Sequence, residues 1–399
     1  MRSIKEIFVI GNGPSSSHTM GPVNATTYIL EKYQNIKFIK ITLYGSLALT
    51  GKGHLTDYVL DKKIKDIPHE IIFDFESKKL PHPNTMDFEV TTTEGVYKER
   101  ILSIGGGSIR TIDDKEEPIK EIYPHNNMEE ILNFCMNNDM TLDEYVLKYE
   151  GEDIKKFMAV ILRRMIKTVI KGVKAEGVLP GELKVQRKAH EMYLRWKALE
   201  DPISKRNYEF MMMIAAYATS EQNASGHKVV IAPTCGSSGV IPGVIAYLFA
   251  RKTPYEDIIK GMMVAGLIGQ LCKTNGSISG AEAGCQAEIG VACSMGAALI
   301  ASARRMENNK IAQCAEIALE HSLGLTCDPV KGYVQIPCIE RCAMYDLKAK
   351  SAFSMCRLIP SQYGKVSFDD SLKTMLSTGK DLPEEYKETS KKGLSKLFD

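Results

Sequence analysis

The stretch MEEILNFCMNNDMTLDEYVLKYEGEDIKKFMAVILRRMIKTVIKGV (residues 128–173) decides the fold class, because its apolar residues recur three and four positions apart. This spacing is typical of amphipathic helices that bury one face. A helical pattern with glycine-rich interruptions continues from there almost to the end of the chain. We therefore expect an all-helical second domain, which we place over residues 127–399.

The residues that precede this stretch follow a different pattern. The run IKFIKITLYGS (36–46) alternates apolar and polar residues, and residues 69–75 and 87–106 are also rich in strand-forming types. Helical patterns at residues 18–34 and 53–64 separate these runs. The mixture predicts a small N-terminal α+β domain over residues 1–126, so the fold class is α+β followed by an all-helical catalytic domain.

Composition excludes several classes of protein. Lys plus Arg number 51 against 49 Asp plus Glu, a net charge of +2 that favours neither nucleic acid nor membrane as a partner. The short apolar run near the N-terminus does not resemble an export signal, so we expect a cytoplasmic protein with reduced thiols. The weakly polar residues 289–303 are too few for a membrane span and predict a buried helix. The charged tail, 377–399, is expected to pack loosely.

A polar cluster, GPSSSHTMGP (13–22), comes directly before a predicted helix. Such a cluster is a solvated turn or an anion site, because short hydroxyls cap helices and the exposed N–H groups attract carboxylates. His18 is a candidate for an acid–base role, since imidazole titrates near neutral pH, and a capping or packing histidine is the alternative. The hydroxyl candidates for substrate binding are Ser15, Ser16, Ser17 and Thr19.

Three of the ten cysteines, Cys285, Cys327 and Cys338, stand among glycines and prolines. Iron–sulfur clusters need thiolate ligands on backbone that can wrap around the inorganic core. A cube with three thiolate ligands has one iron without a protein ligand, which can act as a Lewis acid. Buried structural thiols are the alternative, and the spacing alone does not decide between the two.

Five segments together resemble one enzyme family: GPSSSHTMGP, ITLYGSLALTGKGHLTD, APTCGSSGVIPGV, NGSISGAEAGCQAEIGVACSMGAA and GLTCDPVKGYVQIPCIERCA. They are similar to the signature of the single-chain, iron–sulfur-dependent L-serine dehydratases, and they extend from about residue 9 to about residue 345. The resemblance implies deamination of L-serine to pyruvate and ammonia. It also implies a [4Fe–4S] cluster held by Cys285, Cys327 and Cys338, with an open iron that acts on the substrate hydroxyl and the serine-rich loop facing the cluster.

Two further segments supply candidate residues within this resemblance. CKTNGSISG precedes the first cluster cysteine, and in it Lys273 is a candidate base or a surface residue. The segment PTCGSSGVIPG is a backbone-rich anion cradle or a tight helix start. The remaining candidates for substrate contact are Thr234, Ser237, Ser238, Asn275 and Ser277.

Some features leave alternatives open. Certain relatives end in a cysteine that occupies the free iron, whereas the last cysteine here is Cys356, so that form of self-capping is not expected. Cys235 stands where relatives carry other small residues, and His54 is either structural or part of the site. An L-cysteine desulfidase with related chemistry and a non-catalytic serine sensor are the rival functions. A homodimer is expected, because dimers are the commonest soluble oligomers.

Overall fold

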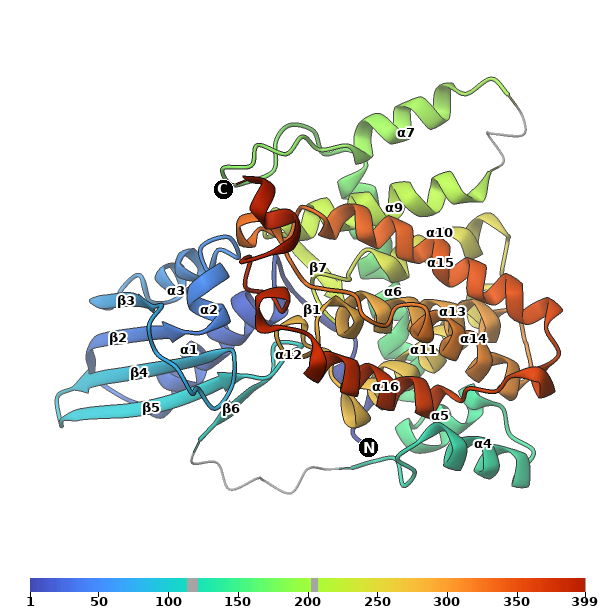
Figure 1. Ribbon diagram of the computed structural model, residues 1–399, viewed down its shortest axis with the longest axis horizontal. Coiled ribbons are helices and arrows are strands. Elements are labelled where there is room, and N and C mark those ends of the chain that lie inside the picture. Colours follow the sequence, from blue (N-terminus) through green and yellow to red (C-terminus); the bar gives the residue numbers. More distant parts are fainter. Residues whose placement is uncertain (113–120, 202–206, 399) are drawn as a thin grey trace.

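The structure is a computed structural model that describes residues 1–112, 121–201 and 207–398. A sheet with short helices forms one side of the molecule, and a larger helical region forms the other (Figure 1). The predicted fold class, α+β followed by helices, is confirmed. The predicted boundary between residues 126 and 127 stays a prediction.

The five-stranded sheet has the strand order β3-β2-β4-β5-β6. Strand β2 pairs in parallel with β3 and antiparallel with β4. Ile39, Ile41 and Leu43 alternate along β2 and are buried, because they face one side of the pleated sheet. The bounds of the strands are β2 (Ile36–Tyr44), β3 (His69–Asp74), β4 (Thr85–Thr92), β5 (Val96–Ser103) and β6 (Ile109–Thr111).

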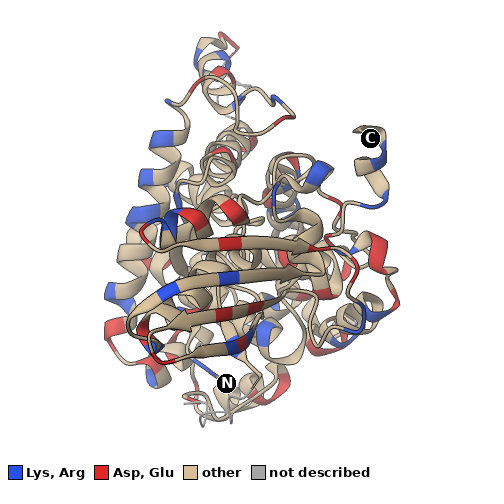
Figure 2. Cartoon of the chain, turned by 90° about the vertical axis from the view of Figure 1, so that its left-hand side faces the viewer, with Lys and Arg blue, Asp and Glu red and all other residues tan. Residues whose placement is uncertain are grey.

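Helices α1 (Gly21–Lys32), α2 (Ser46–Thr50) and α3 (Thr56–Ile64) accompany this sheet. Ala25 and Ile29 of α1 and Leu60 of α3 join the buried strand residues in one apolar core. Charged residues of both signs are spread over the strands on the side that Figure 2 shows. The pattern of one buried and one charged face is what the sequence predicts for a half-buried sheet.

The helical region is built around α13 (Val291–Ala303), all of whose residues are buried. Its Ala, Gly, Ser and Cys side chains are small, so several helices can approach it closely. Helices α10, α11, α14 and α15 pack against it. The bounds of the helices are α4 (Met128–Asn137), α5 (Leu142–Glu150), α6 (Asp153–Gly172), α7 (Ala189–Ala198), α9 (Tyr208–Ala224), α10 (Val240–Ala250), α11 (Tyr255–Asn275), α12 (Gly280–Ala283), α14 (Asn308–Glu320), α15 (Cys338–Leu358) and α16 (Phe368–Asp381).

The predicted buried helix over residues 289–303 is confirmed. Among the described residues, the segment 286–303 is long and apolar enough to cross a membrane, and 94% of it is buried inside the protein. A core helix of a globular protein passes the same length and composition test.

The first twelve residues pack with the helical region and not with the five-stranded sheet. Ile4 and Phe8 lie in the large helical core. Strand β1 (Val9–Asn12) pairs antiparallel with β7 (Lys228–Ile231). The sequence pattern does not show this pairing, because the two strands are short and more than two hundred residues apart. The pairing carries the chain from the helical region directly into the serine-rich segment.

The C-terminal tail lies between the two regions (Figure 1). After α16 it forms two short helical turns, η6 (Glu384–Tyr386) and η7 (Gly393–Phe398). Glu388, Thr389 and Ser395 are buried. The expectation of a loosely packed tail is therefore wrong for these residues, because polar side chains bury when they find polar partners, and the tail finds them.

Candidate active site

The serine loop, residues 13–20, connects β1 to α1 and contains the π-helical turn η2 (Ser16–Met20). The Ser15 Oγ accepts a hydrogen bond from the His18 backbone N–H at 3.0 Å, so Ser15 caps the turn as the sequence suggests. Ser16, Ser17 and Thr19 are buried as well. Single π-helical turns occur frequently at functional sites, because their wider backbone exposes hydrogen-bonding groups. The loop is a buried polar turn and not a solvated one.

His18 lies at the centre of this loop and is fully buried. Its ring stacks on that of His54, with 4.2 Å between the centroids. Its Nε2 lies 3.0 Å from the Ser46 Oγ and 3.1 Å from the Thr50 Oγ1. Burial and the neighbouring His54 hold the pKa of His18 well below its usual value, so the imidazole is neutral at pH 7.

The hydrogen-bond partners assign the tautomer of His18. The Ser46 hydroxyl donates to the Glu388 carbonyl at 2.8 Å, and the Thr50 hydroxyl donates to the Ser46 carbonyl at 2.9 Å. Both hydroxyl protons are thus used, so His18 Nε2 carries a proton and donates it to these two oxygens. The lone pair of the neutral ring is then on Nδ1, which lies 3.4 Å from the Ser15 Oγ.

His54 is also neutral, but its proton is on Nδ1 and its lone pair is on Nε2. Its Nδ1 lies 2.9 Å from the Thr50 carbonyl oxygen, so this nitrogen carries the proton. Burial lowers the pKa of His54 to about 4. Its Nε2 lone pair faces the Glu388 Oε1 at 3.5 Å, and the His18 Nδ1 faces the same oxygen at 3.6 Å.

Glu388 joins this histidine pair to the cysteines. Its backbone N–H donates to the Cys327 carbonyl at 2.8 Å, and the Cys327 N–H donates to the Tyr386 carbonyl at the same distance. Burial, together with the negative charges of Glu288 and Cys285, raises the pKa of Glu388 well above its usual value. A protonated carboxyl group has one proton, which it can donate to only one of the two imidazole lone pairs that face it.

The thiols of Cys285 and Cys327 form the second half of the site. One atom from each of Cys285, Cys327 and Glu288 lies within 4.8 Å of the other two, and all three could hold a metal ion. A hydrogen bond from Cys327, with the cation of Arg341 beside it, lowers the pKa of Cys285 to about 6. A thiolate at Cys285 is therefore favoured near neutral pH, which metal ligation requires.

Cys338 begins α15 and is partly exposed. It is not one of the three residues whose ligand atoms lie within 4.8 Å. Burial, followed by the charge of Cys285, raises the pKa of Cys338 well above its usual value. The structure thus brings two of the three predicted ligands, Cys285 and Cys327, together.

Glycine residues and hydroxyls surround the thiols. A Cβ on Gly280 would lie 3.1 Å from the Cys327 Sγ and 2.7 Å from the Glu288 Oε2, so only glycine fits there without a shift. The Thr234 hydroxyl hydrogen-bonds to Glu288 and lies 3.1 Å from the Ser237 Oγ. Ser238 is buried, and its Oγ has no hydrogen-bond partner among the described residues. The PTCGSSG loop therefore borders the thiols.

Lys273, Asn275 and Ser277 make other contacts. The Lys273 Nζ lies 2.7 Å from the Glu6 Oε2, and the Asn275 side chain donates to the Asn126 carbonyl. The Ser277 hydroxyl donates to the Glu282 Oε2 at 2.6 Å, next to α12. The structure does not place the Lys273 ammonium in the hydrogen-bond network of His18 or of the thiols within its described part. The proposed roles of these three residues stay predictions.

The sequence analysis did not single out Glu288, Arg341 or Glu388. Glu288 follows Cys285 by three residues and Arg341 follows Cys338 by three, so each lies about one helical turn after a predicted ligand. That spacing could have identified both. Glu388 lies in a charged tail, and no local pattern distinguishes it from the other carboxylates there.

Comparisons with known proteins identify the family to which the chain is similar. The family model described as "Serine dehydratase alpha chain" matches residues 97–395, and "Serine dehydratase beta chain" matches residues 3–61. The chain is 36% identical to "L-serine dehydratase" of Haemophilus influenzae, with 99% of both chains covered. It is 38% identical to "L-serine dehydratase TdcG" of Escherichia coli and 37% identical to "L-serine dehydratase" of Helicobacter pylori, each again with 99% of both chains covered.

Proposed function

The chain belongs to the serine dehydratase family and is a lyase, and from this premise we propose that it deaminates L-serine to pyruvate and ammonia with a [4Fe–4S] cluster. The observation that supports this proposal most strongly is the convergence of three distant segments. The serine loop, the Cys285–Cys327 pair and the tail residue Glu388 meet at one buried place.

The residues present fit such a cluster. Cys285, Cys327 and Cys338 would hold it through their sulfurs, which are the soft ligands that iron–sulfur clusters require. Arg341 offers a fixed positive charge beside the thiolates. The glycine at position 280 leaves room where a side chain would meet the Cys327 sulfur. When bound, an iron without a protein ligand supplies Lewis acidity toward the β-hydroxyl of the substrate.

The chain's own residues supply the binding and proton-transfer steps. The serine hydroxyls and backbone N–H groups of the serine loop are suited to hold the substrate carboxylate. The His18 Nδ1 lone pair accepts the α-proton, while Ser46 and Thr50 keep the Nε2 proton and the ring orientation fixed. Loss of water gives 2-aminoacrylate, which tautomerises and hydrolyses to pyruvate and ammonia. The stacked ring of His54 excludes water from one face of His18.

The proposal includes the setting of the enzyme. An iron–sulfur cluster and reduced thiols are suited to the cytoplasm, where thiols stay reduced. L-serine is the only partner that the reaction requires. We keep the homodimer as part of the proposal, since closed twofold assemblies are the commonest arrangement of soluble enzymes.

The test is an anaerobic preparation assayed for pyruvate from L-serine, L-threonine and L-cysteine, with iron content and the visible absorption spectrum measured on the same sample. We expect turnover of L-serine and a brown protein. In Cys327→Ala both colour and turnover should disappear together, whereas Cys272→Ala, a buried thiol on α11, should retain both. A Cys327→Ala variant with full activity would overturn the proposed cluster site, and preference for L-cysteine would indicate a desulfidase.

A further inference from the structure

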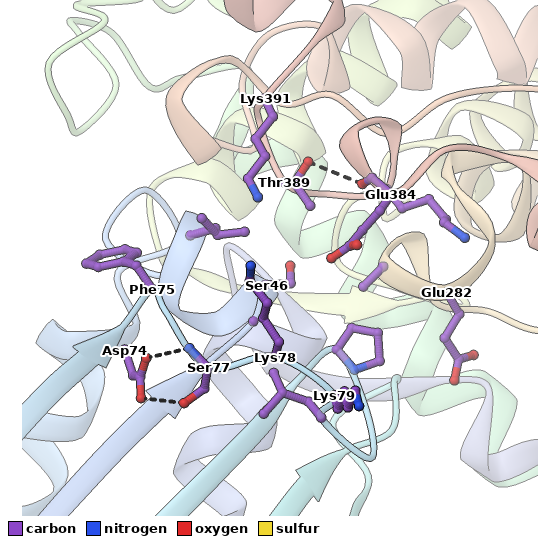
Figure 3. Close-up of a pocket in the computed structure, with 16 residues that line it drawn as sticks. Ser46, Asp74, Phe75, Ser77, Lys78, Lys79, Glu282, Glu384, Thr389 and Lys391 are labelled. Atoms are coloured by element: carbon purple, nitrogen blue, oxygen red, sulfur yellow. Dashed lines mark hydrogen bonds between the residues drawn. The ribbon is translucent and has the colours of Figure 1, made fainter.

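A cavity of about 770 Å³ lies where the sheet domain, α12 and the C-terminal tail meet. Its walls come from the β3–β4 loop, from Gly45 and Ser46 at the start of α2, and from tail residues between Glu384 and Lys391 (Figure 3). The three walls belong to segments that the sequence places far apart, and the buried tail forms one of them.

The cavity reaches the histidine pair through a single side chain. Ser46 lines the cavity, and its Oγ lies 3.0 Å from the His18 Nε2. Thr389, the residue after Glu388, also lines it. A small molecule in the cavity is therefore separated by one hydroxyl group from the Nε2 of His18, and the proposed base atom Nδ1 belongs to the same ring.

Four charged side chains that line the cavity have no partner among the described residues, namely Lys78, Lys79, Glu384 and Lys391. Figure 3 shows Lys78, Lys391 and Glu384 pointing into it from different walls. Within the described part of the chain, neither these three groups nor the ammonium of Lys79 in the same lining makes a hydrogen bond or an ion pair. The Lys387 ammonium, also in the lining, donates to the Gly379 carbonyl. Two other acids of the lining are already engaged, because Asp74 accepts from Ser77 and Glu282 pairs with His82.

Three free ammonium groups, those of Lys78, Lys79 and Lys391, and the free Glu384 carboxylate offer both of the charges that a zwitterion requires. A purely anionic ligand would meet the Glu384 carboxylate, and a purely cationic one would meet the lysines. An α-amino acid presents a carboxylate to the lysines and an ammonium group to Glu384 at the same time. The volume of the cavity exceeds that of one small amino acid, so the cavity does not enclose the substrate tightly. It is suited to admit a hydrated substrate and to orient it.

We propose that this cavity is a vestibule that captures the substrate as an α-amino acid zwitterion, with Lys78 and Lys391 binding the carboxylate and Glu384 the ammonium group. The inference rests on the proposed function and adds the route by which the substrate reaches the proposed active site. The three groups are exposed, and each contact there contributes little. The vestibule therefore acts on KM and not on kcat.

The experiment compares the wild type with a Lys78→Ala/Lys391→Ala double variant and with Glu384→Gln. Binding of glycine, which has no hydroxyl to eliminate, is measured by saturation-transfer NMR, and KM and kcat for L-serine are measured in parallel. The matched control is Lys63→Ala/Lys65→Ala, two exposed lysines at the end of α3. We expect the glycine Kd and the KM to rise about fivefold in the double variant and by less in Glu384→Gln, with kcat retained and the control unchanged.

The outcomes separate this inference from the proposed function. Ethanolamine and lactate, which lack one of the two charges, should bind more weakly than glycine. Glycine binding and KM unchanged in the double variant, with normal turnover of L-serine, would overturn the vestibule and leave the proposed function standing. No turnover of L-serine by the wild type, with glycine binding that the double variant weakens, would overturn the proposed function and support the vestibule.

Discussion

The serine loop and the C-terminal tail are both polar, and both supply a buried group to the same pocket. The loop is recognisable in the sequence because small hydroxyls, a histidine and two Gly-Pro pairs are concentrated in ten residues. The tail has an ordinary composition for an exposed segment, yet Glu388 faces both His18 and His54. The difference teaches that local composition reports how a segment turns, whereas burial of a charged residue depends on partners elsewhere in the chain.

The largest effect is expected from the serine loop. His18→Asn removes the proposed base and keeps a smaller polar side chain, so kcat for L-serine should fall by about 100-fold to 1,000-fold. His190→Asn, which changes a half-buried histidine that bonds to the Val173 carbonyl, is the matched control and should leave kcat unchanged. Pyruvate formation measures both. Near-normal kcat in His18→Asn would mean that the loop only shapes the pocket.

The second effect is a dependence of stability on pH, which follows from the neutral state of His54. The folded pKa of His54 is about 4, below the ordinary value of about 6.5 expected in the unfolded chain. The unfolded state therefore binds more protons between these values, and stability is lost as the pH falls from about 6.5 toward 4. When the pH falls from 7 to 5, the contribution of His54 should lower the free energy of unfolding by about 2 kcal/mol.

His54→Gln should therefore lose less stability over the same interval than the wild type does. The free energy of unfolding from urea titrations at pH 7 and pH 5 measures the difference. Equal losses in the two proteins would show that His54 is not held neutral, and the argument for a protonated Glu388 opposite it would lose its support.

A smaller effect is expected from the tail residue itself. Glu388→Gln keeps a donor opposite the two imidazole lone pairs, so kcat should fall only about tenfold, the equivalent of one weakened hydrogen bond. Glu388→Ala removes the donor and should cost more. Glu385→Gln, an exposed neighbour that pairs with Lys392, is the control. If both Glu388 variants keep full kcat, the tail covers the site but contributes no group to the reaction.

The smallest effect concerns how the tail is attached. The Ser395 hydroxyl donates to the Pro329 carbonyl at 3.0 Å and is buried. Ser395→Ala should weaken docking of the tail by about 1 kcal/mol, which corresponds to about fivefold faster cleavage of the tail by a dilute protease. Ser354→Ala, at an exposed position on α15, should leave the cleavage rate unchanged. Equal cleavage rates in the wild type and both variants would show that the Ser395 hydrogen bond does not hold the tail in place.

The sequence predicts most of the fold and part of the site. Periodicity identifies β2, α1, α3 and the helical region, because each buries a regular apolar face. In the turn between β5 and β6, Gly105, Gly106 and Gly107 have positive φ, which glycine adopts without the strain that other residues incur. The pairing of β1 with β7 could not be predicted, because nothing in either short strand specifies its partner.

The site residues also divide into those that the sequence identifies and those that depend on distant contacts. Cys285 and Cys327 were identified from their glycine- and proline-rich surroundings and lie together. Lys273 was singled out for its chemistry, yet its ammonium pairs with Glu6, a contact that only the position of the N-terminal turn creates. Glu388 was missed, because its role depends on a backbone hydrogen bond to Cys327 and on two histidines more than three hundred residues away.

The most direct test of the central claim, that the serine loop, the cysteines and the tail form one L-serine site, is a crystal structure of the anaerobically prepared protein with glycine bound. We expect cluster density bonded to Cys285, Cys327 and Cys338, with the amino acid beside it and in contact with the serine loop at His18. Density for the cluster or for glycine at a place remote from His18 would contradict the account.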